Sequence, residues 1–487
     1  MDRYYGTSTS TFHLLRKSLM IRLLVLLCIS TIAWAGEPTI RPATRTHQPI
    51  NQIRKIFYQI PIVSAERVAL GLPPVINLSI GQPHISMQTK VLDPFISYLE
   101  NLKGLSPEQL SLEMGYSHSA GIAETRVWIS RFFTESFPEV SEGFTPDEVM
   151  VTNGGTGALT NALKVLIEQE DDVAVFAPYF AAYENQVKSC GGTLVAIPLI
   201  LKRPRADVLD DYLASRPKIK AFIWNDPNNP LGTKAEREEL QALADVLKKY
   251  PNLIVIHDEV YRDTVHNGNP LSLINIAPEL KPRSFIIRSL AKDVLGAPGI
   301  RAGMISAPTN ILTEDGTRIN FIELMSNEQL RDITSVSILV QKMLSIAIEQ
   351  KLSGMIGSWE LAMTKEYANN TKFVVDALAD LGLYPLQAPK GAFFVMIDAS
   401  PLLGKKIPKK IGPIDHLDSK VSKEIRNDLD IAAFFLHAAG VAVVPGSGFG
   451  IEHCSFRISC ARPKEQLIQA TERMKQAVQN AGFCSRD

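Results

Sequence analysis

The 487-residue sequence predicts an α/β fold, with a large domain built on a mostly parallel sheet and a smaller α+β domain after it. Short apolar runs alternate with amphipathic helical patterns through the middle of the chain, which is typical of strands joined by crossover helices. Polar and glycine-rich clusters follow several of these runs. Ligands bind at the carboxyl ends of parallel strands, so the clusters predict a binding site there.

The elements of the large domain follow from hydrophobic periodicity. Strands are predicted at 149–152, 172–176, 221–224, 253–256 and 285–287. A helix is predicted over 158–166, and another over 236–250, where Pro251 ends it. The pattern from 337 to 383 is mainly helical, and the smaller lobe then continues to the C-terminus. Within that lobe the Lys-rich stretch 404–418 is interpreted as a solvated surface loop.

The N-terminus carries the marks of a secretory signal peptide. Arg16 and Lys17 precede an apolar run from Leu23 to Ala35 that ends in small residues and is too short for a stable membrane span. We therefore expect an exported protein. The alternatives are an uncleaved anchor, or a misassigned start in a cytoplasmic protein, for which Met20 could be the true start. The predicted organisation is 1–35 signal peptide, 36–50 linker, 51–88 N-terminal segment packing with the small domain, 89–340 large domain and 341–487 small domain.

Charge and cysteine content narrow the class of partner. Lys+Arg and Asp+Glu both number 51, so nothing favours nucleic acid and a small molecule is the expected ligand. The five cysteines form no Cys-x-x-Cys pair, so no metal site is predicted.

Four segments suggest phosphate and amine chemistry. Lys292 follows an apolar strand, and a desolvated lysine becomes a nucleophile. Ser289 and Arg301 flank it with groups that suit a phosphate. The alternative is a surface lysine beside a glycine turn. The turn at Gly155 and Thr156 opens a helix, and helix N-termini bind phosphate.

The other two segments end in polar side chains. Asn229 lies in a proline-flanked stretch after a strand, which alone reads as a turn. Asp258 ends another strand, where a carboxylate could hold a heterocyclic nitrogen protonated. Tyr261 follows closely and could bind a ring hydroxyl. His257 points to the opposite face by strand alternation and is interpreted as a packing residue.

In their order and combination these segments resemble those of fold-type I pyridoxal phosphate (PLP) enzymes, specifically the class I/II aminotransferase family, from about Asn51 to the C-terminus. The resemblance implies that Lys292 is the Schiff-base lysine and proton shuttle. It also implies cofactor-binding roles for Gly155, Thr156, Phe180, Asn229, Asp258, Tyr261, Ser289, Arg301 and Tyr116. Phe180 would stack on the ring, unless Tyr179 or Tyr183 does so.

Two further segments resemble the family's substrate contacts. Arg457 matches the arginine that grips the substrate carboxylate, and Gly81 and Asn229 match the neighbouring contacts. Tyr116 resembles a tyrosine that reaches the partner subunit's cofactor, which implies a homodimer. Some aspartate-specific members have a lysine where Thr156 stands. The chain also departs from the family in having Ala291 before the lysine, Leu231 after the asparagine motif, and one extra residue between Lys292 and Arg301.

The resemblance implies transamination between an amino acid and a 2-oxo acid. Two alternatives stay open. One is another PLP reaction on the same fold, such as C–S lysis by elimination, cyclopropane formation or decarboxylation, because fold does not fix the reaction. The other is a non-catalytic binding protein.

Overall fold

The computed structural model describes residues 52–85, 88–199, 204–292, 294–313 and 315–483. The predicted signal peptide and nearly all of the linker lie in residues 1–49, and residues 50–487 form one compact unit. Both predicted segments fall outside the described residues. Among the described residues, no helix is both long and apolar enough to cross a membrane.

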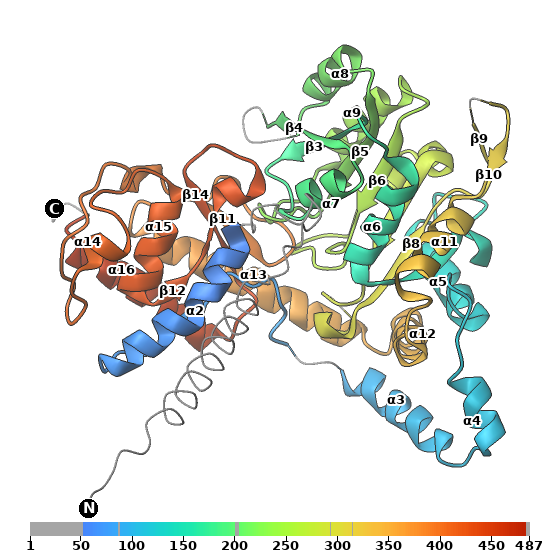
Figure 1. The fold of residues 1–487 in the computed structure, drawn as a ribbon, viewed down its shortest axis with the longest axis horizontal. Helices are drawn as coiled ribbons and strands as arrows, with labels where there is room; N and C mark the ends of the chain where they lie inside the picture. The colour runs from blue at the N-terminus through green and yellow to red at the C-terminus, as the bar shows by residue number, and fades with distance from the viewer. Residues whose placement is uncertain (1–51, 86–87, 200–203, 293, 314, 484–487) are drawn as a thin grey trace, which may run out of the picture. The chain divides into compact units, whose positions relative to one another are not determined.

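The large domain is built on a seven-stranded sheet with the order β2-β8-β7-β6-β5-β3-β4 (Figure 1). Only β8 runs antiparallel to its neighbours. The strands are β2 (Val149–Asn153), β3 (Asp172–Ala177), β4 (Thr193–Pro198), β5 (Ile219–Asn225), β6 (Ile254–Asp258), β7 (Ser284–Arg288) and β8 (Ala302–Ser306). The five predicted strands and the mostly parallel α/β class are confirmed. The sequence reading did not identify β4 and β8.

Ten helices of the large domain are described. They are α3 (Thr89–Leu102), α4 (Pro107–Glu113), α5 (Ala123–Ser136), α6 (Gly154–Leu166), α7 (Tyr183–Ser189), α8 (Ala206–Ser215), α9 (Arg237–Lys248), α10 (Leu273–Ile276), α11 (Phe321–Ile333) and α12 (Ile338–Leu352). A short hairpin pairs β9 (Ile311–Leu312) with β10 (Arg318–Ile319). The 3₁₀ turns here are η2 (Pro146–Glu148), η3 (Pro278–Arg283) and η4 (Pro298–Ile300).

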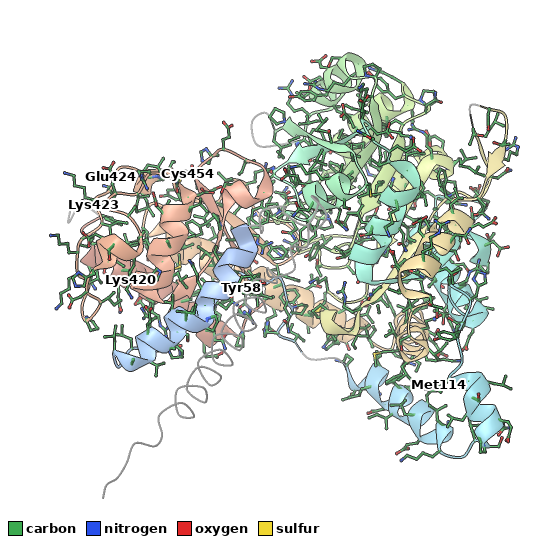
Figure 2. The ribbon with its side chains drawn as sticks, in the orientation of Figure 1. Tyr58, Met114, Lys420, Lys423, Glu424 and Cys454 are labelled. Atoms are coloured by element: carbon green, nitrogen blue, oxygen red, sulfur yellow. The ribbon has the colours of Figure 1, made fainter. Side chains whose placement is uncertain are left out.

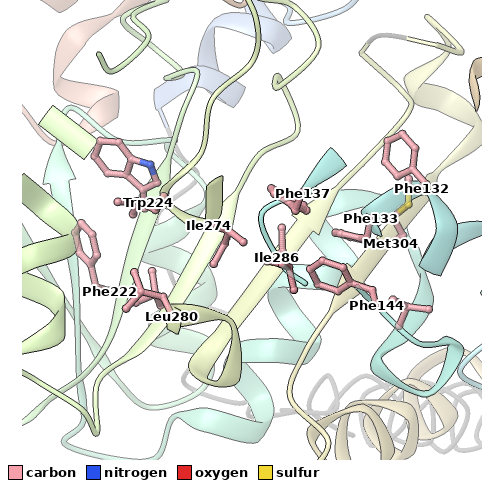
Figure 3. Close-up of a cluster of buried hydrophobic side chains, with 14 of the residues drawn as sticks. Phe132, Phe133, Phe137, Phe144, Phe222, Trp224, Ile274, Leu280, Ile286 and Met304 are labelled. Carbon is pink, nitrogen blue, oxygen red and sulfur yellow. The ribbon is translucent and has the colours of Figure 1, made fainter. Parts of the chain in front are cut away.

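Alternating side chains of the strands enter two different hydrophobic cores. Phe222 and Trp224 of β5 belong to a cluster with α5, α9 and α12, whereas Ala221 and Ile223 belong to a cluster with α6, α7 and α11. Figure 3 shows part of the first cluster, which includes Phe132 and Phe133 of α5 and Ile286 of β7. Covered on both faces, the sheet leaves only its strand ends for polar side chains.

The smaller lobe combines helices with short strands. Its elements are α2 (Gln52–Ala69), β1 (Ile76–Asn77), α13 (Gly357–Ala379), β11 (Phe394–Asp398), η5 (Ser400–Leu402), α14 (Leu417–Lys420), α15 (Asp428–Phe434), the π-helix η6 (Phe435–Ala439), β12 (Val441–Ala442), β13 (Val444–Pro445), η7 (Gly446–Phe449), β14 (Ser455–Ser459) and α16 (Lys464–Asn480). The antiparallel sheet β11-β14-β13 carries Arg457, and β1 pairs in parallel with β12.

A separate core stabilises this lobe and includes residues from both ends of the described chain. Ile56 and Val63 of α2 share it with Phe434, Phe456 and many aliphatic side chains. The Lys-rich stretch 404–418 takes part as well. Its lysines lie toward solvent as expected, but its isoleucines and a leucine are buried in this core, so the stretch is an anchored loop: Ile407, Ile411, Ile414 and Leu417.

Candidate active site

All the sequence-predicted site residues except Tyr116 line one cavity of about 290 Å³ at the carboxyl ends of the parallel strands. They come from seven separate segments of the chain: Gly81, Gly155, Thr156, Phe180, Asn229, Asp258, Tyr261, Ser289, Lys292, Arg301 and Arg457. Tyr116 lies elsewhere, between α4 and α5, with 91% of its surface exposed. The structure therefore assembles these distant motifs at a single place.

Lys292 follows β7 and reaches into the cavity. Its Nζ donates a 2.5 Å hydrogen bond to the carbonyl oxygen of Gly81, which lies between β1 and α3. Burial, together with the positive charges of Arg301 and Arg457, lowers the pKa of the Lys292 amine to about 8. A lysine in this setting supplies a neutral, nucleophilic amine near physiological pH.

Asp258 ends β6 and is buried at the floor of the cavity. Its Oδ2 accepts a 2.5 Å hydrogen bond from the hydroxyl of Tyr183, on the first turn of α7. Its Oδ1 is buried and has no hydrogen-bond partner among the described residues. Burial raises the pKa of the carboxyl, and the Tyr183 hydrogen bond opposes that effect. An unpaired buried carboxylate oxygen is costly, so this atom is suited to a donor on a ligand.

Asn229 is held by a residue that the sequence reading missed. Asn225 ends β5; its Oδ1 accepts from the Asn229 backbone N–H at 2.9 Å, and its Nδ2 donates to the Asp258 carbonyl at 2.8 Å. Asn225 thus ties two of the predicted ligands together. It opens the same polar stretch as Asn229, but nothing in the sequence distinguishes its structural role from a turn-forming one.

Arg457 lies on the middle strand of the small antiparallel sheet. Its guanidinium donates to Asn229 Oδ1 at 2.8 Å and to the Ser79 carbonyl oxygen at 2.7 Å. The rings of Phe394 and Phe449 lie 4.4 and 4.9 Å from it. Burial lowers its pKa to about 10, so the side chain stays charged at neutral pH. A fixed, flat cation of this kind suits a carboxylate ligand.

Tyr261 is buried against aromatic rings on the other side of Asn229. Its ring meets those of Phe393 and Phe394 edge to face, each with centroids 5.6 Å apart. Burial raises the pKa of the Tyr261 hydroxyl, so it acts as a neutral hydrogen-bonding group. His257 is buried on the opposite face of β6, where its Nε2 lies 3.0 Å from Ser284 Oγ. That placement confirms its packing role.

The phosphate-type ligands gather at the N-terminus of α6. Gly155 and Thr156 belong to its first turn, whose backbone N–H groups have no partner within the helix. Arg301 follows η4 with a left-handed backbone (φ 62°) and donates to the carbonyl oxygens of Pro298 and Asn153. The Ser289 hydroxyl donates to the Ala302 carbonyl at 2.9 Å. Helix dipole and guanidinium together make this end of the cavity positive.

Phe180 is half-buried on the cavity wall, and its ring meets Tyr183 edge to face with centroids 5.5 Å apart. Tyr183 itself is engaged with Asp258. Of the two neighbouring aromatics, Tyr179 is buried against Gly450. Phe180 is therefore the member of this segment with a free face toward the cavity.

Comparison with known proteins agrees with this geometry. The family model for class I and II aminotransferases matches residues 73–474. An aspartate/prephenate aminotransferase of Nitrosomonas europaea is 27% identical over 82% of this chain and 91% of its own length. A probable aspartate/prephenate aminotransferase of Thermus aquaticus is 29% identical over 75% of this chain and 84% of its own.

Solved structures give the same result. The aspartate aminotransferase of Rhizobium meliloti superposes with a TM-score of 0.76 and 25% identity, covering 91% of this chain and all of that one. The similar proteins and the similar solved structure are all named as aminotransferases, which supports amino-group transfer. None of them favours elimination, decarboxylation or a non-catalytic role. The chain therefore belongs to the class I and II aminotransferase family, as a transaminase of a family that works with pyridoxal phosphate.

Proposed function

We propose that the cavity around Lys292 binds PLP and carries out transamination of an α-amino acid there. The observation that carries the proposal is the buried, unpartnered Oδ1 of Asp258 beside a lysine whose pKa is about 8. A protonated ring nitrogen is the donor that this oxygen lacks. PLP, when bound, supplies an electron sink for the substrate's α-carbon.

The residues of the cavity fit the rest of the group. Its phosphate would lie at the first turn of α6, between Thr156, Ser289 and Arg301. Its ring would lie against Phe180, above Asp258. Asn229 and Tyr261 would bind the ring hydroxyl. These assignments leave Arg457 for the substrate.

In this scheme each side chain has one task. Arg457 holds the substrate carboxylate and so fixes the α-carbon near Lys292. Lys292, freed from the cofactor, removes the proton from that carbon with its neutral amine and returns it elsewhere, as a general base and then acid. Asp258 keeps its negative charge next to the ring nitrogen throughout.

We infer that the donor side chain is uncharged. Among the described residues that line the cavity, the cationic ones are Lys292, Arg301 and Arg457, and each already has a task. Ile80 lies beside the substrate end, between Ser79, which binds Arg457, and Gly81, which binds Lys292, and Phe57 of α2 also lines the cavity. A charged side chain buried there would lack a partner. Aspartate, which the relatives' names give, is the competing donor.

We also propose a homodimer with shared active sites. Large apolar side chains are exposed along α4 and the loop after it: Leu110, Leu112 (85% exposed), Met114 and Tyr116. Figure 2 labels Met114 there, and Tyr58 on α2, which is 62% exposed. Apolar side chains gathered in this way mark protein contacts, and a second copy of this chain is the partner that Tyr116 requires.

The test is chemical trapping. The chain from residue 36 onward is mixed with PLP, reduced with borohydride and digested, and the modified peptide is identified by mass spectrometry. The label is expected on Lys292 and not on Lys281, a second buried lysine whose Nζ is paired with Glu148. No label in folded protein, or a label spread over surface lysines, would refute the cofactor assignment.

Spectral titration with leucine, phenylalanine and aspartate then tests the class of amino donor. If aspartate changes the spectrum at lower concentration than leucine and phenylalanine do, the donor is not uncharged and that inference is refuted.

A further inference from the structure

Tyr183 lines the described cavity with a fully buried hydroxyl that the proposed scheme has not used. It lies on the first turn of α7 and lines the same cavity as Asp258. Its hydroxyl reaches only the Oδ2 oxygen of Asp258, at 2.5 Å. The other oxygen, Oδ1, is buried without a hydrogen-bond partner among the described residues, and Asp258 is part of the cavity lining.

The direction of this hydrogen bond is fixed by the surroundings. Burial and the neighbouring Asp258 charge both raise the pKa of the Tyr183 hydroxyl well above its ordinary value. The hydroxyl therefore keeps its proton, and it donates that proton in a hydrogen bond to Asp258, whose ionised carboxylate can only accept. A donor to a carboxylate stabilises the ionised form over the protonated one.

Asp258 needs such help because its environment favours the neutral acid. Burial raises the pKa of this carboxyl, and the charge of Glu259 raises it further. The groups that oppose this are the Tyr183 hydroxyl and the backbone N–H of Val260. Glu259 keeps its charge in an ion pair with Arg262, at 3.0 Å. A substitution can remove the Tyr183 hydroxyl, because it belongs to a side chain, but it cannot remove the backbone N–H of Val260.

We propose that Tyr183 is a positioning residue that keeps Asp258 ionised and aimed at the cofactor, so that the ring proton stays on nitrogen and not on the carboxylate. The inference rests on the proposed function, in which Asp258 faces the PLP nitrogen. Between a carboxylate and a pyridine the proton can lie on either partner, and a second donor on the carboxylate moves it to the nitrogen. The same residue also supports Phe180, whose ring it contacts.

The experiment measures the ring nitrogen directly. Wild-type protein and Y183F are loaded with ¹⁵N-labelled PLP, and the nitrogen chemical shift, which follows protonation, is recorded at fixed pH. We expect a protonated signal in the wild type and a shift toward the unprotonated value in Y183F. We also expect kcat to fall about ten- to a hundred-fold, as for loss of a hydrogen bond to a charged group, with KM changed little.

The matched control is Y250F. Tyr250 also donates to an aspartate, with its hydroxyl 2.6 Å from Asp210 Oδ1, but this pair lies between α8 and α9, away from the cavity. It should leave the nitrogen signal and kcat unchanged. An identical nitrogen signal in wild type and folded, PLP-loaded Y183F would overturn the inference.

A second cofactor separates a role at the nitrogen from a role in packing. In 1-deaza-PLP a carbon replaces the ring nitrogen. Y183F should bind PLP about ten-fold more weakly than the wild type does, but both should bind 1-deaza-PLP equally. If Y183F loses affinity equally for both cofactors, Tyr183 has a packing role and the proposal is refuted.

If Y183F does not fold, D258N and D258N/Y183F are compared. If Tyr183 acts through Asp258, the double variant should lose no more PLP affinity than D258N does. A further loss of PLP affinity in the double variant refutes the proposal.

Trapping of PLP on wild-type Lys292 is done first. Its failure would refute the proposed function. The nitrogen signal is measured only in protein that has passed that test, so the two failures are distinguishable.

Discussion

The guanidinium of Arg457 donates a 2.8 Å hydrogen bond to the amide oxygen of Asn229, a residue 228 positions earlier in the chain. This contact decides which way the Asn229 amide points. Its oxygen is taken by Arg457, so its NH₂ group is the end left for a ligand, and it can donate to the oxygen of a ring hydroxyl. One hydrogen bond thus orients a substrate ligand and a cofactor ligand together.

Arg457→Lys should weaken binding of the substrate far more than binding of the cofactor. The ammonium keeps the charge but cannot bind the carboxylate, Asn229 and Ser79 with one planar group. We expect KM for the amino donor to rise about ten- to a hundred-fold, while PLP is still trapped on Lys292. Arg462→Lys is the control, because Arg462 belongs to the same segment but binds only the Asn77 carbonyl. Similar losses in both variants would contradict the role of Arg457.

Capture of PLP by the apoprotein should depend on pH through Lys292. Only the neutral amine reacts, and a pKa of about 8 leaves about a tenth of it neutral at pH 7. The rate constant for capture should rise between pH 7 and 9 and level off above. Stopped-flow absorbance measures it, with Nα-acetyl-lysine in parallel to account for the titration of PLP itself. A profile that followed the model amine up to pH 10 would exclude the lowered pKa.

Gly303 should resist substitution, whereas Gly299 should tolerate it. The two glycines lie on either side of Arg301. A Cβ at Gly303 would come within 2.3 Å of the Gly154 carbonyl carbon, but one at Gly299 would meet nothing within 4 Å. We expect Gly303→Ala to lower the free energy of unfolding by about 1–3 kcal/mol and to weaken PLP binding. Gly299→Ala should change neither. Denaturant melts and PLP titration check both, and equal behaviour of the pair would show that the Gly154–Gly303 contact is not critical.

Complementation should reveal shared active sites. Lys292→Ala and Tyr116→Ala chains are each expected to be inactive or nearly so, and mixing them with subunit exchange should restore activity. Random pairing makes half the dimers mixed, each with one complete site, so about a quarter of wild-type activity is expected. Lys292→Ala mixed with Arg457→Ala is the control: both residues line the same chain's cavity, so no complete site can form. Recovery in both mixtures, or in neither, would contradict a site completed by the partner's Tyr116.

Export is tested at the N-terminus of the full-length chain. Expressed in a bacterial host with a secretion system, the protein should be recovered outside the cytoplasm. Its intact mass should correspond to cleavage after residue 35. A cytoplasmic protein of uncleaved mass, or one that starts at Met20, would refute the signal peptide.

Several site residues could be predicted because their motifs are local. The helix opened by Gly155 and the strand ended by Asp258 can be read from neighbouring residues alone, since burial and turn chemistry act over a few positions. Asn225 and Tyr183 could not be found in this way. Their roles depend on partners 33 and 75 residues away in the chain, Asp258 in both cases. Strand β8 was missed for a related reason, since it pairs with the distant strand β2. Strand β4 pairs only with the preceding strand β3, and most of its side chains are exposed or half-buried, so it lacks a buried apolar run.

The sequence by itself determined the family, the alternation of strands and helices, and the chemical types gathered in the cavity. Those properties follow from hydrophobic period, glycine and proline placement, and the order of a few motifs. Only the tertiary structure decided that Asp258 has one oxygen held by Tyr183 and the other free, and that Arg457 lies between two aromatic rings against Asn229. The physical reason is that burial and hydrogen-bond pairing across distant segments set the charge and orientation of a side chain, and no local pattern encodes them.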